Sequence, residues 1–355
     1  MIKTYLLTLQ PLEPYFFGNE KTFSFDPKKP EDNRYFIKSD RMPLQTTVLG
    51  MLRYLLMPVK NPHYRYTAQE QQRNAAVVGG DSFSIEAQEQ QFGAIEKLSP
   101  VFLLKGQAKY VRTPFDHCPN VKDQYTPMTQ AIEVDMEQGK VTYFREFDAK
   151  EGIQDSFMNV ADGSLVSSDK IFGSTVRVGV NKLQREKGFY KRQFACMNAG
   201  WAFGAYVRLD VDLIDEGTLQ TLKAGTVAYM GQNKSAFAVR LSQEENELAA
   251  AVSQRLLQGR IYCLGDTLAE PSVYQKCTFA ATMLRDYRAY TTKFVAKDQN
   301  GEYVGTVSKS ASLYKLLCAG SLLIPREGED LTDCLKKTNC RKIGFNITVP
   351  NGEDE

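Results

Sequence analysis

The sequence predicts an α+β fold. Segments with the pattern of strands and segments with the pattern of helices occur in both halves of the chain, without the strict β-α-β-α alternation of a doubly wound sheet. The 355 residues are enough for one large or two ordinary domains, and no repeat of about 20–50 residues is visible. The character of the sequence changes at Trp201, so we place a domain boundary near residue 200.

The composition is typical of a soluble globular protein, with 43% apolar and 24% charged residues. No apolar run approaches the roughly 18 residues that a membrane span needs, and the first ten residues are too short and too polar for a signal peptide. We therefore expect a cytoplasmic protein whose seven Cys are reduced thiols. Because the number of Cys is odd and no Cys-x-x-Cys occurs, neither a disulfide framework nor a zinc ribbon is indicated. No metal site and no cofactor are expected.

The net charge of +2 is not that of a free-standing nucleic-acid binder, so any RNA site must be local. Basic residues are concentrated in two stretches. Residues 28–65 contain eight Lys and Arg against three acidic residues, and residues 177–192 contain six against one.

The first elements follow from the spacing of apolar residues. Residues 2–9 alternate as a strand does, with Tyr5, Leu7 and Leu9 on one face. Pro and Gly then break the chain into a loop that contains aromatic residues at positions 15–17. These rings could stack on bases, but we favour a place in the core, since aromatic residues beside a first strand are more often buried.

Three helices are expected next. Thr46 or Thr47 can cap a helix that ends before Pro58. Its buried stripe is formed by apolar residues at helical spacing, namely Val48, Leu49, Leu52, Leu55 and Leu56. A second helix covers roughly 66–77 and ends at Gly79-Gly80, and a third is predicted near 84–98.

The remaining elements are mainly strands. Residues 101–104 and 109–112 predict a strand pair, 131–136 and 141–145 a hairpin, and 148–170 a mobile loop. After Trp201 we predict strands at 201–213, 226–229, 236–241 and 260–264, with further strands in 276–295 and 311–324. Helices are expected at 215–223 and 245–257.

Three segments carry chemical signals. In residues 41–53, a Pro-containing loop leads into an apolar helix and could aim Arg41 at an anion. Residues 172–192 are expected to be a flexible stretch that interleaves cations with Phe189 and Tyr190, which suits phosphates and unstacked bases, although for an arbitrary protein a solvated charged loop is the plainer interpretation. Residues 230–237 have the glycine and lysine of a turn but not the spacing of a P-loop.

Catalytic patterns are poor. The only two His are His63 and His117, and neither lies in a recognisable nucleophile setting, although one His can serve a metal-independent ribonuclease. Asp210 and Asp212 alternate on a strand and are expected to face solvent rather than a metal. No catalytic residue is therefore assigned.

The motifs resemble those of RAMP proteins, the RNA-binding subunits of CRISPR effector complexes. Residues 43–53 match the pattern Pro-x-x-x-Thr-x-x-Gly-x-x-Arg, and residues 177–190 match Arg-x-Gly-Ile/Val followed by Gly-x-Phe/Tyr-Tyr in its looser form. Residues 230–235 and 317–324 resemble the family's Leu/Met-Gly-x-x-x-Ser and Ala-Gly-Ser segments, whereas the closing glycine loop at 343–347 is eroded. Their order is most similar to the third subunit of the Cmr (type III-B) complex.

The resemblance implies two RRM-like (ferredoxin-like) domains with an inserted β-hairpin or thumb. The first would cover 1–200, with a thumb region at about 113–192, and the second 201–355. It also implies a non-catalytic subunit in antiviral defence that grips the 5′ repeat-derived handle of the CRISPR RNA. This subunit would link the large polymerase-like signalling subunit to a backbone RAMP subunit.

The same resemblance, with the local charge, identifies the residues expected to contact RNA. They are Arg41, Arg53, Arg177, Asn181, Lys182, Arg185, Phe189, Tyr190, Lys191, Arg192, Gly231 and Lys234. The cations would bind phosphates, and the two aromatic residues would stack on bases or wedge between them.

Three alternatives stay open. The chain could be the equivalent subunit of the Csm (type III-A) complex, which is usually shorter. It could be a CRISPR-RNA processing endonuclease of the same fold, which would need a catalytic base such as His63 or His117. It could also be an unrelated α+β protein with a charged loop.

Overall fold

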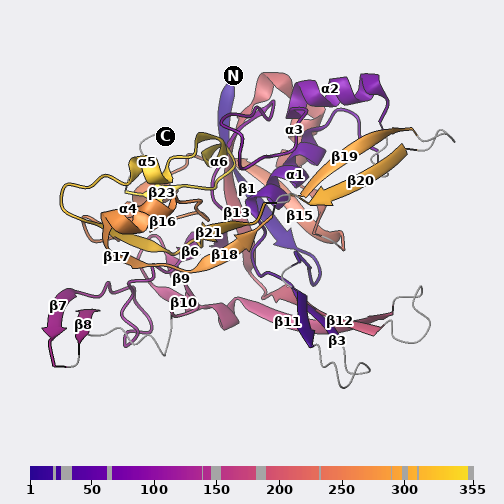
Figure 1. The fold of residues 1–355 in the computed structure, drawn as a ribbon. Coiled ribbons are helices and arrows are strands. Elements are labelled where there is room, and N and C mark those ends of the chain that lie inside the picture. Colours follow the sequence, from indigo (N-terminus) through magenta and orange to yellow (C-terminus); the bar gives the residue numbers. More distant parts are fainter. Residues whose placement is uncertain are drawn as a thin grey trace.

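The computed structural model describes residues 1–18, 21–24, 34–61, 66–137, 139–144, 153–180, 189–231, 233–288, 290–297, 303–309 and 312–350. Most strand pairs in these ranges are antiparallel, and the helices are few and short (Figure 1). The predicted α+β class is confirmed. Among the described residues, no helix combines the length and the apolar character needed to span a membrane.

The largest sheet is built around β1 (Ile2–Pro11). β1 pairs with β13 (Trp201–Asp210) on one side and with β15 (Ser235–Gln243) on the other, both antiparallel. The full order is β10-β9-β6-β5-β13-β1-β15-β14, with β4 also paired to β13. The other strands of this sheet are β4 (Ile95–Leu98), β5 (Phe102–Lys105), β6 (Ala108–Arg112), β9 (Ser156–Asn159), β10 (Leu165–Ser167) and β14 (Thr226–Met230).

The alternation of β1 places its apolar residues as predicted. Tyr5, Leu7 and Leu9 are fully buried in one core cluster with the apolar stripe of α1 (Gln45–Leu56). Leu6 belongs to a second cluster on the opposite face, which includes residues of α4 (Leu248–Ser253). The sheet is therefore covered on both faces near its centre, as expected for a central strand.

The helices differ from the prediction in two respects. Neither Thr46 nor Thr47 caps α1. Its N-cap is Leu44, whose apolar side chain has no oxygen to accept a capping hydrogen bond, while its carbonyl accepts from the N–H groups of Thr47 and Val48. By contrast, α2 (Ala68–Val78) has a full capping box between Thr67 and Glu70, and it ends at Gly79 as predicted.

The helix predicted near 84–98 is wrong. Gly93 has φ +61°, and a Cβ there would lie 2.2 Å from the carbonyl oxygen of Val77. The next residue, Ala94, donates to that same carbonyl over 2.7 Å. The chain thus folds back against α2 and enters β4, whose pairing with β13 overrides the local helical pattern.

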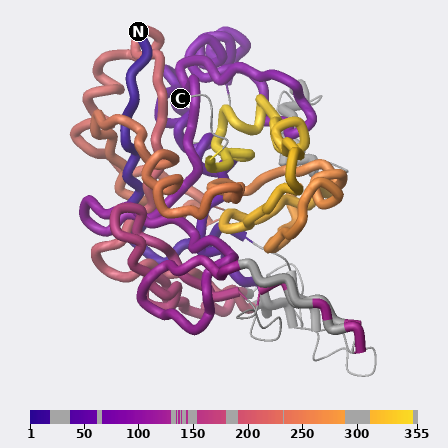
Figure 2. Tube along the Cα trace, turned by 90° about the vertical axis from the view of Figure 1, so that its left-hand side faces the viewer, coloured from indigo at the N-terminus to yellow at the C-terminus, as the bar shows by residue number. Residues whose placement is uncertain are grey.

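The middle of the chain contains the predicted strand pair and hairpin. β5 pairs with β6, and β7 (Gln130–Asp135) pairs with β8 (Lys140–Phe144) in a hairpin that projects from the body of the molecule (Figure 2). The mobile loop predicted at 148–170 is wrong for its second part, since β9 pairs with β6 and every residue of β9 is buried. The η2 turn (Ser168–Lys170) follows, and residues 148–152 lie outside the described ranges.

A four-stranded sheet forms a separate ribbon. β11 (Phe172–Val180) and β12 (Phe189–Met197) are antiparallel, and β12 is parallel to β3 (Arg34–Lys38), which pairs with β2 (Lys21–Ser24). The flexible stretch predicted over 172–192 is therefore wrong where the chain is described.

The C-terminal part is made of short elements. One sheet has the order β17-β22-β16-β23, and two further pairs are β18-β21 and β19-β20. These strands are β16 (Ile261–Cys263), β17 (Cys277–Ala281), β18 (Leu284–Tyr287), β19 (Tyr290–Lys297), β20 (Tyr303–Lys309), β21 (Tyr314–Leu317), β22 (Leu322–Pro325) and β23 (Thr348–Val349). The helical elements after residue 200 are η3 (Val211–Leu213), α3 (Glu216–Ala224), η4 (Pro271–Lys276), α5 (Thr332–Leu335) and α6 (Thr338–Lys342), together with α4, which is shorter than predicted.

The predicted domain boundary near residue 200 falls between β12 and β13. Because β13 lies between β5 and β1, segments before and after residue 200 contribute strands to one sheet. The division into 1–200 and 201–355 stays a prediction, and the β1–β13 pairing crosses it.

A buried ion pair ties the connector before the β7–β8 hairpin to the C-terminal part. The guanidinium of Arg260 contacts the carboxylate of Asp116, and the two residues are 5% and 0% exposed. Asp116 also accepts from the Tyr125 hydroxyl over 2.8 Å, and Arg260 donates to the carbonyl of Met128 over 2.8 Å. Each charge is thus paired and hydrogen-bonded, as a buried charge must be.

We expect Asp116→Ala to destabilise the protein by about 3–5 kcal/mol, because Arg260 would remain charged and buried without its partner. Urea denaturation of the full chain measures the loss. The double variant Asp116→Leu with Arg260→Met removes both charges and should recover most of the stability. A double variant no more stable than Asp116→Ala would contradict this account.

Candidate nucleic-acid interface

The register of the β11–β12 ribbon brings two predicted phosphate-binding residues together. Arg177 lies directly opposite Arg192 in the antiparallel pair, so both side chains leave the same face of the ribbon. Phe194, two residues beyond Arg192, lies on that face as well. The sequence showed the cations but not this pairing, which depends on the register between β11 and β12.

Aromatic rings support both guanidinium groups. The guanidinium of Arg177 lies 4.7 Å from the centre of the Phe194 ring, and that of Arg192 lies 5.4 Å from the centre of the Phe16 ring. The two rings contact each other at 5.4 Å between centres. Phe16 and Phe194 are buried, whereas Arg177 is exposed. The rings therefore restrict the cations by cation–π contact and leave the charge of Arg177 open to solvent.

The turn between β14 and β15 completes this face. Arg192 donates to the side-chain oxygen of Asn233 over 2.9 Å, and Lys234 in the same turn is exposed. Gly231 has φ +79°, and a Cβ there would lie 2.3 Å from the carbonyl oxygen of Phe16. Glycine is thus required for the turn to pack on the aromatic loop. We call Arg177, Arg192 and this turn the ribbon face.

Lys191 lies on the opposite face of the ribbon. It pairs with Val178, whose side chain is 62% exposed, and Val176 on the same face is 52% exposed. Phe189 and Tyr190 belong to β12, but the structure describes only their main chain. Asn181, Lys182 and Arg185 lie outside the described residues. Their predicted RNA contacts stay predictions.

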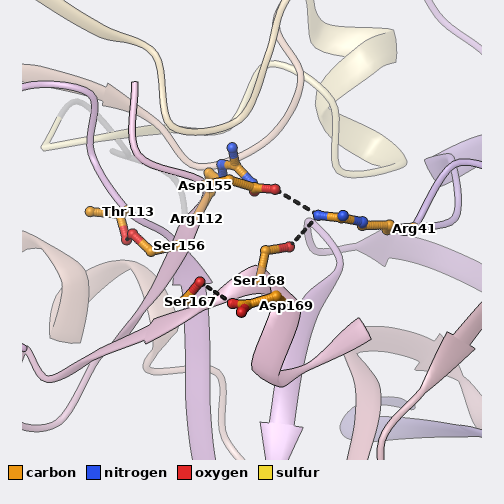
Figure 3. Close-up of polar contacts among 8 residues, drawn as sticks. All are labelled: Arg41, Arg112, Thr113, Asp155, Ser156, Ser167, Ser168 and Asp169. Atoms are coloured by element: carbon orange, nitrogen blue, oxygen red, sulfur yellow. Dashed lines mark hydrogen bonds and ion pairs between the residues drawn. The ribbon is translucent and has the colours of Figure 1, made fainter. Parts of the chain in front are cut away.

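Arg41 lies at the start of the ribbon. Its guanidinium is 2.6 Å from Asp155 and 2.7 Å from the hydroxyl of Ser168, and it lies 6.0 Å from the ring centre of Phe172, the first residue of β11 (Figure 3). Sequence reasoning missed Arg112, which binds the same carboxylate of Asp155 from the end of β6. The one available signal was an Arg at the end of a predicted strand, next to a turn-rich connector.

Arg53 has structural partners. Its guanidinium donates to the carbonyl of Gly79 over 2.5 Å and to that of Asp81 over 2.8 Å, and so binds the chain that follows α2. Burial lowers the pKa of Arg53 from its ordinary value. The predicted RNA contact of Arg53 stays a prediction.

His117 is engaged by main-chain groups through both ring nitrogens. Nδ1 accepts from the N–H of Thr126 over 3.2 Å, and Nε2 lies 2.8 Å from the carbonyl oxygen of Val121. Burial lowers the pKa of His117, which favours the neutral ring. His63 lies outside the described residues. Within the described ranges, no three His, Cys, Asp or Glu side chains gather as metal ligands.

No protein-family model and no curated protein matches this sequence. Solved structures match it over nearly its full length. The first is a chain in the cryo-EM structure of a type III-B Cmr-beta complex bound to cognate target RNA, with a TM-score of 0.50 and 12% identity over 97% of this chain and 96% of that one. The chain shares the fold of that complex's subunit.

Two further matches are weaker. The same type of complex with target RNA and AMPPnP gives a TM-score of 0.45 and 11% identity, covering 96% of this chain and 94% of that one. The Csm3–Csm4 subcomplex of a type III-A interference complex gives 0.38 and 10%, covering 91% and 93%. Of these three matches, the first has a TM-score of 0.50 and bears on the fold, and at 12% identity the likeness does not extend to activity.

We expect Gly231→Ala to destabilise the protein by about 3 kcal/mol or more. The added Cβ would clash with the main chain of Phe16, and alanine is also strained at the positive φ of this position. Gly106→Ala is the matched control. Gly106 has φ +60° with nothing within 4 Å, so its cost should be about 1 kcal/mol. Urea denaturation measures both. Equal losses would mean that the close approach to Phe16 contributes nothing.

Proposed function

We propose that this chain is a non-catalytic, RNA-binding subunit of a type III CRISPR effector complex. It holds the 5′ repeat-derived handle of the CRISPR RNA and links the large polymerase-like subunit to a backbone RAMP subunit, as the third subunit of a Cmr (type III-B) complex would. The observation that carries the proposal is the ribbon face, where Arg177 and Arg192 lie side by side over contacting aromatic rings.

The ribbon face suits a single-stranded RNA backbone. Guanidinium groups bind phosphate oxygens in a fixed fork, and aromatic support reduces the freedom that binding would otherwise remove. The net charge of +2 is too small for general attraction to nucleic acid, so a local face of this kind must supply the affinity. The shared fold with a type III-B subunit agrees with this assignment.

The endonuclease alternative is less favoured by the geometry of His117. A general base needs a ring nitrogen that can reach the 2′-hydroxyl of the substrate. In the structure, both ring nitrogens of His117 are occupied by Val121 and Thr126. The Csm alternative differs only in the identity of the complex, and the partners that copurify with the chain distinguish the two.

We expect Arg177→Glu to weaken binding of a repeat-derived RNA oligonucleotide about tenfold. The slope of log K against log salt concentration should become less steep by about 0.7, which is the value for one phosphate contact to a single strand. Fluorescence anisotropy at several salt concentrations measures both quantities. Because Arg177 is exposed, the substitution should leave the fold intact.

Lys336→Glu is the control for this experiment, since it makes the same change of charge at an exposed position between α5 and α6, far from the ribbon (Figure 1). Its affinity for RNA should equal that of the unaltered chain. If both variants lost affinity to the same degree, binding would reflect overall charge and the ribbon face would not be the site.

A further inference from the structure

A second pair of arginines lies at the start of β11. Arg41 and Arg112 come from opposite sides to one carboxylate, that of Asp155. Arg112 contacts Oδ1, and Arg41 contacts Oδ2 over 2.6 Å, while the hydroxyl of Ser168 accepts from Arg41 over 2.7 Å (Figure 3). One anion thus binds two guanidinium groups through its two oxygens.

The surroundings repeat the design of the ribbon face. Arg41 lies over the Phe172 ring at 6.0 Å and Arg112 over the Phe157 ring at 5.5 Å, and the two rings lie 6.0 Å apart. Phe172 is five residues before Arg177 on β11, which corresponds to about 17 Å along a strand. β11 thus contributes one residue to each arrangement, and because side chains alternate along a strand, Phe172 and Arg177 point to opposite faces of β11.

The carboxylate of Asp155 is accessible to solvent. Its side chain is 49% exposed, as is that of Arg41, whereas Arg112 is 22% exposed. An ion pair with this exposure contributes little to folding, so replacing the carboxylate by another anion costs little. The main chain of Asp155 is held separately, because its carbonyl accepts from the N–H of Ser168 over 2.9 Å. The side chain can therefore leave while the backbone stays.

Phosphate fits the same partners better than a carboxylate does. It carries more charge and more acceptor oxygens, and arginine binds it in charge-assisted hydrogen bonds through two N–H groups. The neighbouring carboxylate of Asp169 bonds to Ser167, and Lys170 lies beside it. Of these two carboxylates, that of Asp155 is the one paired with Arg41 and Arg112.

We propose that Arg41, Arg112 and Ser168 form a phosphate site, and that Asp155 occupies it as an internal competitor until a phosphate of the RNA backbone displaces it. The identification of the phosphate as that of RNA rests on the proposed function, whereas the site itself does not. Asp155 thereby sets a threshold, so that only an anion able to outcompete a tethered carboxylate binds here.

The test uses the full chain and two probes, inorganic pyrophosphate and a repeat-derived RNA. Asp155→Asn keeps the size of the side chain and removes the competing charge. It should bind pyrophosphate about fivefold more tightly than the unaltered chain, a gain of about 1 kcal/mol. The titration is followed by the rise in Tm. Adding Arg112→Gln to this variant should abolish the gain.

Asp169→Asn is the matched control, because it removes the same charge from a carboxylate that bonds to Ser167 instead. Its pyrophosphate affinity should equal that of the unaltered chain. If Asp155→Asn and Asp169→Asn behaved alike, or if no variant bound pyrophosphate, the site would not exist. The Tm of each variant without anion identifies any loss of folding.

The RNA probe separates this proposal from the proposed function. A parallel gain of about fivefold for RNA in Asp155→Asn supports both. A gain for pyrophosphate with no RNA binding by any variant would leave the phosphate site in place and overturn the RNA function. RNA binding that depends on Arg177, together with equal pyrophosphate and RNA affinities in Asp155→Asn and Asp169→Asn, would overturn the phosphate site alone.

Discussion

Tyr15 joins the central sheet to the β11–β12 ribbon, and much of the candidate site depends on it. Its N–H donates to the carbonyl of Ala195 in β12 over 2.8 Å, and its carbonyl accepts from the N–H of Ala195 over 3.0 Å. Its hydroxyl donates to the carbonyl of Arg41 over 2.7 Å. The ring is fully buried between Phe203 and Phe237, and burial raises its pKa. One residue thus positions the ribbon through its main chain and the Arg41 segment through its hydroxyl.

The sequence predicted those parts of the fold in which local pattern and tertiary contact agree. β1 alternates because it lies in the middle of a covered sheet, and the capping box of Thr67 determines where α2 begins. The helix expected near 84–98 failed because the pairing of β4 with β13 and the approach of Gly93 to α2 outweigh local propensity. The charged stretch beginning at residue 172 was predicted to be flexible, because its many cations were interpreted as a solvated segment. The structure instead has the strands β11 and β12 there.

The sequence identified several residues of the candidate site but not how they are arranged in space. Charge counts identified Arg177 and Arg192, but only the register shows that they are opposite each other. Gly231 was taken for a backbone contact to RNA, and the structure adds a packing reason for the same glycine. Arg112 was not predicted, because a single arginine in a strand forms no recognisable sequence motif. It becomes a candidate only through its ion pair with Asp155, which Arg41 also binds. A chain of nearly balanced charge can in this way bring cations from separate segments together at particular places on its surface.

The central claim is that this chain binds the repeat-derived handle of a CRISPR RNA as part of an effector complex. The most direct test is to express the chain with its genomic neighbours, purify it through a tag, and sequence the RNA that copurifies. The account predicts short RNAs that share one repeat-derived 5′ end, together with the large polymerase-like subunit and a backbone subunit. Recovery of the chain alone, without partners and without RNA of common 5′ end, would contradict it.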